Sequence, residues 1–202
     1  MVETQLRHRG IQDERVLQVM REIPREEFVR PEAQVFAYQD DPVPIGFRQT
    51  ISQPYMTALM AEVLELKGTE TVLEVGTGSG YAAAVLGALA AEVITIELIP
   101  ALADFARENL TRTGRHRNVL VIGGDGSLGY PPRAPYDAIS VAAAAPEIPA
   151  ALLSQLREPG RLVIPVGPTD DQELRVVFKT GGNLDSRIAT LCRFVPLRGS
   201  QH

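Results

Sequence analysis

The sequence predicts an α/β fold: a doubly wound, mostly parallel seven-stranded sheet that ends in an antiparallel hairpin and follows an N-terminal helical extension. From residue 71 onward, short apolar stretches alternate with helix-like ones, which is typical of a parallel sheet covered by helices on both faces. The last two strand-like stretches have no room for a helix between them, so they should pair antiparallel. The first third of the chain lacks this alternation, and it is therefore expected to precede the sheet.

The N-terminal extension is expected to hold two helices joined by a loop. Residues 11–23 repeat apolar side chains on one helical face, and Pro24 ends this helix. A second helix begins at Pro54, and Gly68 ends it. Residues 28–52 are predicted to be loop, because four helix and strand breakers interrupt them: Pro31, Pro42, Pro44 and Gly46.

The core is expected to follow in regular order. The predicted strands are 71–75, 92–97, 119–122, 136–141, 161–166, 174–179 and 187–195. The predicted helices between them are 80–90, 101–113 and 150–156. We therefore expect a single domain, 1–202, in which residues 1–68 form the extension and residues 69–202 form the core.

Composition excludes several classes of protein. The net charge of −5 offers no general cationic field for nucleic acid or an anionic membrane. The single cysteine, Cys192, excludes an intramolecular disulfide, which fits a reducing compartment. The start of the chain is polar, unlike a signal peptide, and no apolar run approaches the length of a membrane span. We expect a cytoplasmic monomer without nucleic-acid or membrane partners.

The first motif with chemical content lies where a predicted strand leads into a helix. Its glycines allow a tight turn and close approach of a ligand, and the helix N-terminus offers free N–H groups. A dinucleotide fingerprint would place the third glycine at position 81, which here is Tyr81. The motif instead resembles the cofactor loop of Class I methyltransferases, although any α/β protein can contain a glycine turn. It predicts cofactor contacts from Glu74, Gly76, Thr77, Gly78, Ser79 and Gly80.

Two acidic residues follow at the ends of later strands. Glu97 closes the next strand about 20 residues after the first loop glycine, where a carboxylate can accept hydrogen bonds from both ribose hydroxyls. Asp125 is placed to accept a hydrogen bond from an adenine amino group, and Gly126 gives access to the backbone. Singly they could be a solvated strand-end acid and an Asp-Gly turn. Together with the glycine loop they predict an S-adenosylmethionine site, to which we add Leu98 beside Glu97.

The segment after the fourth strand bears on the methyl acceptor. Methyltransferases that act on amino groups of nucleic acids usually carry an Asn/Asp-Pro-Pro-aromatic motif there. This chain has residues 141–149 instead, which include no side chain placed to hydrogen-bond an exocyclic amine. A cytosine-C5 enzyme needs a cysteine nucleophile, and Cys192 is far in sequence from the strand-end loops. A methyltransferase for a small molecule or RNA, or a binding protein that keeps the fold, remains open at this point.

A longer stretch, from Pro44 to Met56, resembles the substrate loop of protein-L-isoaspartate O-methyltransferases through its Gln-Thr-Ile-Ser-Gln-Pro centre. Five further segments resemble that family in the same order: 72–81, 123–127, 136–149, 160–167 and 193–197. The resemblance implies transfer of a methyl group from S-adenosylmethionine to the free carboxylate of L-isoaspartyl residues in damaged proteins and peptides. It implies no metal.

The resemblance also implies roles for single residues. Ser52 matches the family's active-site serine, and Thr50 and Ile51 match its substrate-facing loop. Because Ser52 precedes a predicted helix, the alternative is that it only caps that helix. The chain departs from the family at three positions: Leu98, where many members have Arg, Arg48, where bacterial members often have Gly, and Tyr55, where some have His.

No general base is expected in this chemistry. A carboxyl of this kind has a pKa of about 4, so it is already an anion at neutral pH. The enzyme has to align the carboxylate oxygen, the methyl carbon and the sulfur, and such positioning can contribute up to roughly 7–11 kcal/mol. The three histidines, His8, His116 and His202, are expected at the surface.

Overall fold

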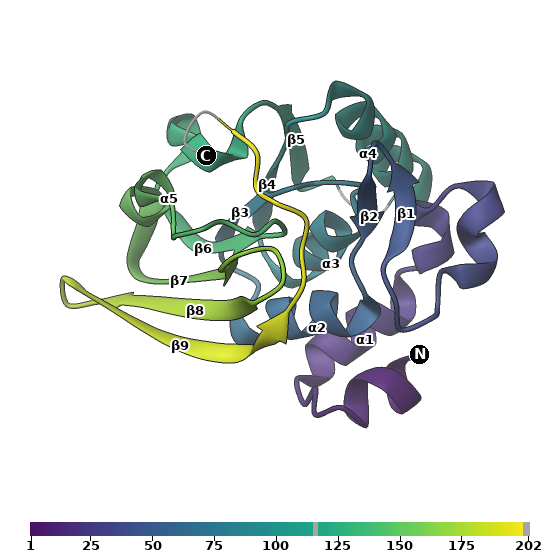
Figure 1. The fold of residues 1–202 in the computed structure, drawn as a ribbon, viewed down its shortest axis with the longest axis horizontal. Helices are drawn as coiled ribbons and strands as arrows, with labels where there is room; N and C mark the ends of the chain where they lie inside the picture. The colour runs from purple at the N-terminus through teal and green to yellow at the C-terminus, as the bar shows by residue number, and fades with distance from the viewer. Residues whose placement is uncertain (115–116, 200–202) are drawn as a thin grey trace.

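The computed structural model describes residues 1–114 and 117–199, in which a seven-stranded sheet lies between helices (Figure 1). The strand order is β5-β4-β3-β6-β7-β8-β9. Neighbouring strands from β5 to β7 pair in parallel, whereas β8 pairs antiparallel with both β7 and β9. The predicted sheet is therefore confirmed. The strands are β3 (Thr71–Val75), β4 (Glu92–Glu97), β5 (Val119–Gly123), β6 (Tyr136–Val141), β7 (Leu156–Val166), β8 (Gln172–Thr180) and β9 (Asn183–Cys192).

Alternation of side chains along the strands divides the core into two layers. Val72 and Val93 face one layer, which contains residues of the helices α1 (Glu14–Glu22), α2 (Pro54–Val63), α3 (Tyr81–Leu89) and α4 (Pro100–Thr113). Leu73 and Ile94, one residue further along their strands, face the other layer with α5 (Ala150–Gln155). Both faces of the central strands are thus buried, which explains why the sequences of these strands are almost continuously apolar.

The extension contains more regular structure than the sequence predicts. Residues 28–52, predicted to be loop, hold the 3₁₀ helix η3 (Pro31–Phe36) and a hairpin of β1 (Val43–Gly46) and β2 (Gln49–Ile51). The prediction failed because strands this short carry almost no alternation, and Pro44 lies inside one of them. The extension also contains η1 (Val2–Arg7), a π-helix, and η2 (Arg25–Phe28), a 3₁₀ helix.

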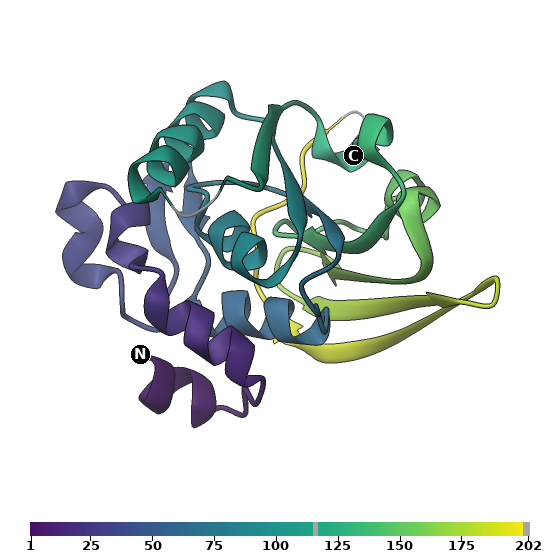
Figure 2. The same ribbon diagram turned by 180° about the vertical axis from the view of Figure 1, so that it is seen from behind.

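The terminal hairpin projects from the sheet at the side opposite the helices of the extension (Figure 2). Its second strand runs from Asn183 to Cys192, several residues earlier than the predicted 187–195. The reason is that pairing across the turn begins with Thr180 opposite Asn183, before any apolar alternation starts. Two short 3₁₀ helices, η4 (Gly126–Leu128) and η5 (Pro131–Arg133), complete the description. Among the described residues, no helix is both long and apolar enough to cross a membrane.

Candidate active site

The glycine loop between β3 and α3 forms one wall of a cleft at the carboxyl ends of the parallel strands. Gly76, Gly78 and Gly80 have φ values of 94°, 56° and 87°, a region that glycine adopts without strain. At Gly80, which precedes α3, an added Cβ would lie 3.3 Å from the side chains of Ala106 and Leu110 on α4. Backbone conformation and helix packing therefore both favour glycine in this loop.

The cleft has an empty volume of about 950 Å³, partly open to solvent. Its lining combines backbone groups of the glycine loop with the carboxylate of Glu97 and apolar side chains, a mixture that is common in small-molecule sites. Most of the residues that the sequence singled out line it: Thr50, Ile51, Ser52, Gly76, Thr77, Gly78, Ser79, Glu97, Leu98 and Gly126. Gly80, Glu74 and Asp125 do not lie on its wall.

Glu97 lies at the end of β4 with its side chain anchored to the glycine loop. Its Oε2 accepts a hydrogen bond of 2.8 Å from the backbone N–H of Gly78, and its Oε1 accepts one of 3.0 Å from the N–H of Ile99. The residue is 7% exposed, so it is not a solvated strand-end acid. A carboxylate has about four acceptor positions, so two remain for the hydroxyl pair of a ribose.

Glu74 lies behind the cleft wall and not on it. Its Oε2 accepts a 2.6 Å hydrogen bond from the hydroxyl of Thr95, which is also 2.6 Å from the hydroxyl of Thr77 in the glycine loop. Its Oε1 is buried and has no hydrogen-bond partner within the described part of the chain. Burial raises the pKa of Glu74 to about 8, the bond from Thr95 lowers it in part, and the charge of Glu97 raises it further. Glu74 thus stabilises the glycine loop indirectly, through the hydroxyls of Thr95 and Thr77.

Asp125 and Gly126 occupy the turn after β5. Gly126 lines the cleft, and an added Cβ there would lie 2.5 Å from Val75, so only glycine fits. The carboxylate of Asp125 accepts hydrogen bonds of 2.9 Å and 2.7 Å from the backbone N–H and the hydroxyl of Ser127. Gly199 near the end of the described chain packs against the same carboxylate. In this structure Asp125 therefore shapes the turn that carries Gly126.

The segment Thr50–Ser52 lies on the cleft wall together with the glycine loop, although more than twenty positions separate them in the sequence. Ser52 does not cap α2: the N-cap is Gln53, and the hydroxyl of Ser52 has no hydrogen-bond partner among the described residues. The alternative that Ser52 only caps the helix is therefore wrong. Its hydroxyl remains available to a ligand.

The C-terminal segment after β9 completes the cleft, and sequence reasoning did not assign it to the site. Residues 195–198 line the cleft, where they cross the ends of the central strands (Figure 1). Backbone hydrogen bonds fix them to the loop after β6: Ala144 N–H donates to Val195 O at 2.8 Å, and Leu197 N–H donates to Ala144 O at 2.7 Å. Residues 195–197 lie within the segment 193–197 that resembles the family, and this resemblance was the available signal.

A second, more open hollow with an empty volume of about 1390 Å³ adjoins the cleft. Both share Thr50, Ser52, Ala142, Val195 and Pro196, so Ser52 lies where they meet. Cys192 also lines the hollow, but burial raises the pKa of its thiol to about 11, which leaves it protonated at neutral pH. A protonated thiol is a poor nucleophile.

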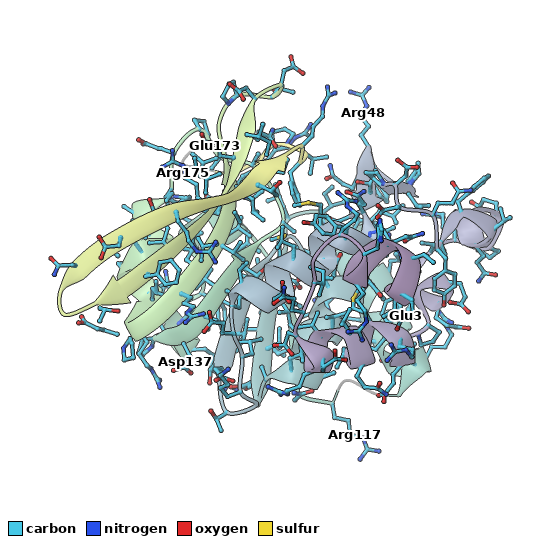
Figure 3. The ribbon with its side chains drawn as sticks, turned by 90° about the horizontal axis from the view of Figure 1, so that it is seen from below. Glu3, Arg48, Arg117, Asp137, Glu173 and Arg175 are labelled. Carbon is cyan, nitrogen blue, oxygen red and sulfur yellow. The ribbon has the colours of Figure 1, made fainter. Side chains whose placement is uncertain are left out.

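The three departures from the family pattern lie at different places: Leu98 lines the cleft, Tyr55 lines the adjoining hollow, and Arg48 lines neither. Arg48 projects from the tip of the β1–β2 hairpin, away from the body of the molecule (Figure 3). Its φ is 59°, in the region that favours glycine, which explains why glycine suits this position. Tyr55 lines the open hollow, with the guanidinium of Arg9 stacked 3.7 Å from its ring centre. Leu98 lines the cleft and is 43% exposed.

The described residues that line the cleft include no histidine. In residues 1–114 and 117–199, no cluster of three or more His, Cys, Asp or Glu side chains could hold a metal ion. His8 is exposed, is the C-cap residue of η1 and is not among the residues that line the cleft, and His116 and His202 lie outside the described residues.

Known proteins resemble the chain over its whole length. The family model for protein-L-isoaspartate(D-aspartate) O-methyltransferase (PCMT) matches residues 1–202. A protein-L-isoaspartate O-methyltransferase of Methanoculleus marisnigri is 54% identical over 200 residues, which cover 98% of this chain and 90% of the relative. One of Koribacter versatilis is 54% identical over 201 residues, covering 100% of this chain and 90% of that relative.

Solved structures of the same family superpose on this chain over nearly its whole length. A protein-L-isoaspartate O-methyltransferase superposes with a TM-score of 0.87 at 30% identity, covering 98% of this chain but 66% of that longer chain. A beta-aspartate methyltransferase (PCMT) from Plasmodium falciparum, solved with S-adenosyl-L-homocysteine, has a TM-score of 0.82 at 29% identity, covering 98% and 96%. This chain therefore belongs to the protein-L-isoaspartate(D-aspartate) O-methyltransferase family.

Proposed function

We propose that this protein transfers a methyl group from S-adenosylmethionine to the free α-carboxylate of L-isoaspartyl residues in damaged proteins and peptides. The observation that carries the proposal is the meeting of two features at Ser52. The cleft lined by the glycine loop and Glu97 suits a nucleoside cofactor, and the larger hollow that adjoins it suits a polypeptide. Both reach the same hydroxyl.

The cofactor site is proposed to use the residues on the cleft wall. Glu97 is held by two backbone N–H groups, so it accepts the ribose hydroxyls without first having to be ordered. The loop around Gly76 and Gly78 gives close backbone approach for the methionine part. Gly126 leaves room for the adenine, while Glu74, Gly80 and Asp125 act by supporting these groups.

The acceptor site is proposed to position a carboxylate and to exclude water. When bound, S-adenosylmethionine supplies a methyl group already activated by the positive sulfur. The hydroxyl of Ser52 donates a hydrogen bond to the acceptor carboxylate and orients one oxygen toward the methyl carbon. Thr50 and Ile51 hold the peptide beside it. The acceptor anion forms the ester bond as the carbon–sulfur bond breaks, and no proton has to move.

The choice of isoaspartate over aspartate must come from geometry, since both carry a carboxylate of similar pKa. In isoaspartate the main chain passes through the side-chain carbon, and the free carboxylate is attached to the α-carbon. A loop that binds the main chain on both sides places only that isomer's oxygen in line. A misplacement of about 1 Å can cost on the order of a hundredfold in rate.

The cell compartment and partners follow as parts of the same proposal. A single cysteine fits a reducing compartment such as the cytoplasm. The net charge of −5 disfavours nucleic acid as the acceptor. We further propose that residues 1–202 act as one domain, because the extension supplies Ser52 and the core supplies Glu97 to the same cleft.

The test is methyl transfer to paired peptides that differ only in isoaspartate or aspartate at one position. Initial rates at equal concentration should favour the isoaspartyl peptide by at least a hundredfold, with one base-labile methyl ester formed per S-adenosylhomocysteine released. The Ser52→Ala variant serves as the matched control. Equal rates on both peptides, or activity on only RNA or a small molecule, would contradict the proposed acceptor.

A further inference from the structure

Arg25, the first residue of η2, has the largest fully buried side chain among the described residues. Its Nε donates a 2.7 Å hydrogen bond to the carbonyl of Ala37, and its Nη2 donates one of 2.6 Å to the carbonyl of Ser52. Both partners are main-chain atoms. The guanidinium therefore connects two segments of the extension, one of which carries the hydroxyl at the meeting point of the cleft and the hollow.

The charge of Arg25 is only weakly compensated. Neither of its hydrogen bonds goes to a carboxylate, and its Nη1 is buried without a hydrogen-bond partner in residues 1–114 and 117–199. The ring of Tyr81 lies 4.9 Å from the guanidinium carbon. Burial lowers the pKa of Arg25 to about 10, which still leaves it charged at neutral pH. Burying such a cation costs free energy that an apolar side chain of similar size would not, so stability alone does not explain it.

The neighbours of Arg25 indicate what it does. Ser52 lies between the end of β2 at Ile51 and the start of α2 at Pro54, so its carbonyl is outside the hydrogen-bonded pairing of the strands. Arg25 supplies the missing donor. Tyr81 is the first residue of α3, directly after the glycine loop, and it lines the same cleft as Ser52. One buried side chain thus contacts both the acceptor segment and the start of the helix that follows the cofactor loop.

We propose that Arg25 is a positioning residue for methyl transfer. By fixing the carbonyl of Ser52, it fixes the direction in which the Ser52 hydroxyl leaves the backbone. By packing on Tyr81, it sets that hydroxyl at a constant distance from the glycine loop. Arg25 does not line the cleft, so it acts through these two residues. The inference rests on the proposed function, because it assigns the orientation of Ser52 a role in the transfer step.

The experiment is a double-mutant cycle of Arg25→Met and Ser52→Ala, assayed with the isoaspartyl peptide. Methionine keeps much of the volume of arginine but cannot donate a hydrogen bond. Arg25→Met in the otherwise wild-type enzyme should lower kcat by about a hundredfold, the scale of a 1 Å misplacement. In the Ser52→Ala enzyme the same change should lower kcat by less than about threefold, because the group being positioned is gone.

Arg15→Met is the matched control. Arg15 also donates to two main-chain carbonyls, at 2.5 Å to Leu66 and 3.3 Å to Leu89, but neither lines the cleft. Its loss should lower Tm and leave kcat within about twofold of wild type. The dissociation constant for S-adenosylhomocysteine should stay nearly constant in all variants, because the bond that anchors Glu97 to Gly78 involves neither arginine.

Two results would overturn the proposal: a kcat of Arg25→Met within about twofold of wild type, or an equally large loss in the Ser52→Ala background. If Arg25→Met does not fold at the assay temperature, Arg25→Leu, which also cannot donate a hydrogen bond, replaces it at a lower temperature at which it is folded, and it is judged by the same two results. A wild-type enzyme that does not act on isoaspartyl peptides would instead contradict the proposed function. The two failures are therefore distinguishable.

Discussion

Replacing Glu74 by Gln should change how the stability of the protein depends on pH. Glu74 is 1% exposed, and burial is the main reason that its pKa rises from 4.5 to about 8. A glutamine keeps an oxygen that can accept the 2.6 Å hydrogen bond from Thr95, but it cannot ionise. The substitution therefore removes the titration and leaves much of the packing.

The size and sign of the effect follow from proton linkage. Below pH 4.5 the carboxyl is protonated in the folded and unfolded states alike, so its titration costs nothing. Between pH 4.5 and about 8, only the unfolded state releases the proton, so stability falls as pH rises. The slope is about 1.4 kcal/mol per pH unit. From pH 5 to 8, Glu74→Gln should thus gain on the order of 4 kcal/mol relative to wild type.

The measurement is urea unfolding of the cofactor-free protein, followed by circular dichroism at pH 5, 6, 7 and 8. Glu70→Gln is the control. Burial raises the pKa of Glu70, but the backbone N–H groups of Lys67, Gly68 and Thr69, together with its own, lower it more. Its stabilising contribution is present above pH 4.5 and is lost only as pH falls below that value, so its variant should differ from wild type by a constant amount between pH 5 and 8. A constant difference for Glu74→Gln as well, or one that shrinks with pH, would refute the reasoning.

Three further predictions concern the cleft. Calorimetry should detect binding of S-adenosylmethionine and S-adenosylhomocysteine but no appreciable binding of NAD, because the third loop glycine is Gly80 and position 81 is Tyr. Tight binding of NAD without binding of S-adenosylmethionine would contradict the assignment of the cofactor. Glu97→Ala should weaken cofactor binding by about 1–3 kcal/mol. It should also lower Tm, because the backbone N–H groups of Gly78 and Ile99 lose their hydrogen-bond acceptor. An unchanged dissociation constant for the cofactor would show that Glu97 is not part of the site. Ser52→Ala should lower kcat while the dissociation constant for S-adenosylhomocysteine stays nearly the same, and full activity would leave Ser52 without a role in the transfer.

The core was predictable because its signals are local. The strands at 71–75, 92–97 and 136–141 have the expected bounds, since each is a short apolar run buried on both faces and bounded by polar or turn residues. The β1–β2 hairpin was missed because its strands have four and three residues. The start of β9 was misplaced because its first residues are exposed and, except for Leu184, polar, so only pairing with β8 defines them.

The sequence alone established the order of strands and helices, the glycine loop and the acid at the end of the second core strand. Each of these features depends on residues close together in the sequence: the alternation of apolar and polar residues, the helix and strand breakers, and the spacing of glycines. The distinction between Glu97 on the cleft wall and Glu74 behind it could not be read this way, because it depends on which way each strand-end side chain faces once the sheet is covered. The same holds for the segment 195–198 and for Arg25, which reach the site from distant parts of the chain. Such contacts depend on chain packing in three dimensions, so only the tertiary structure decided them.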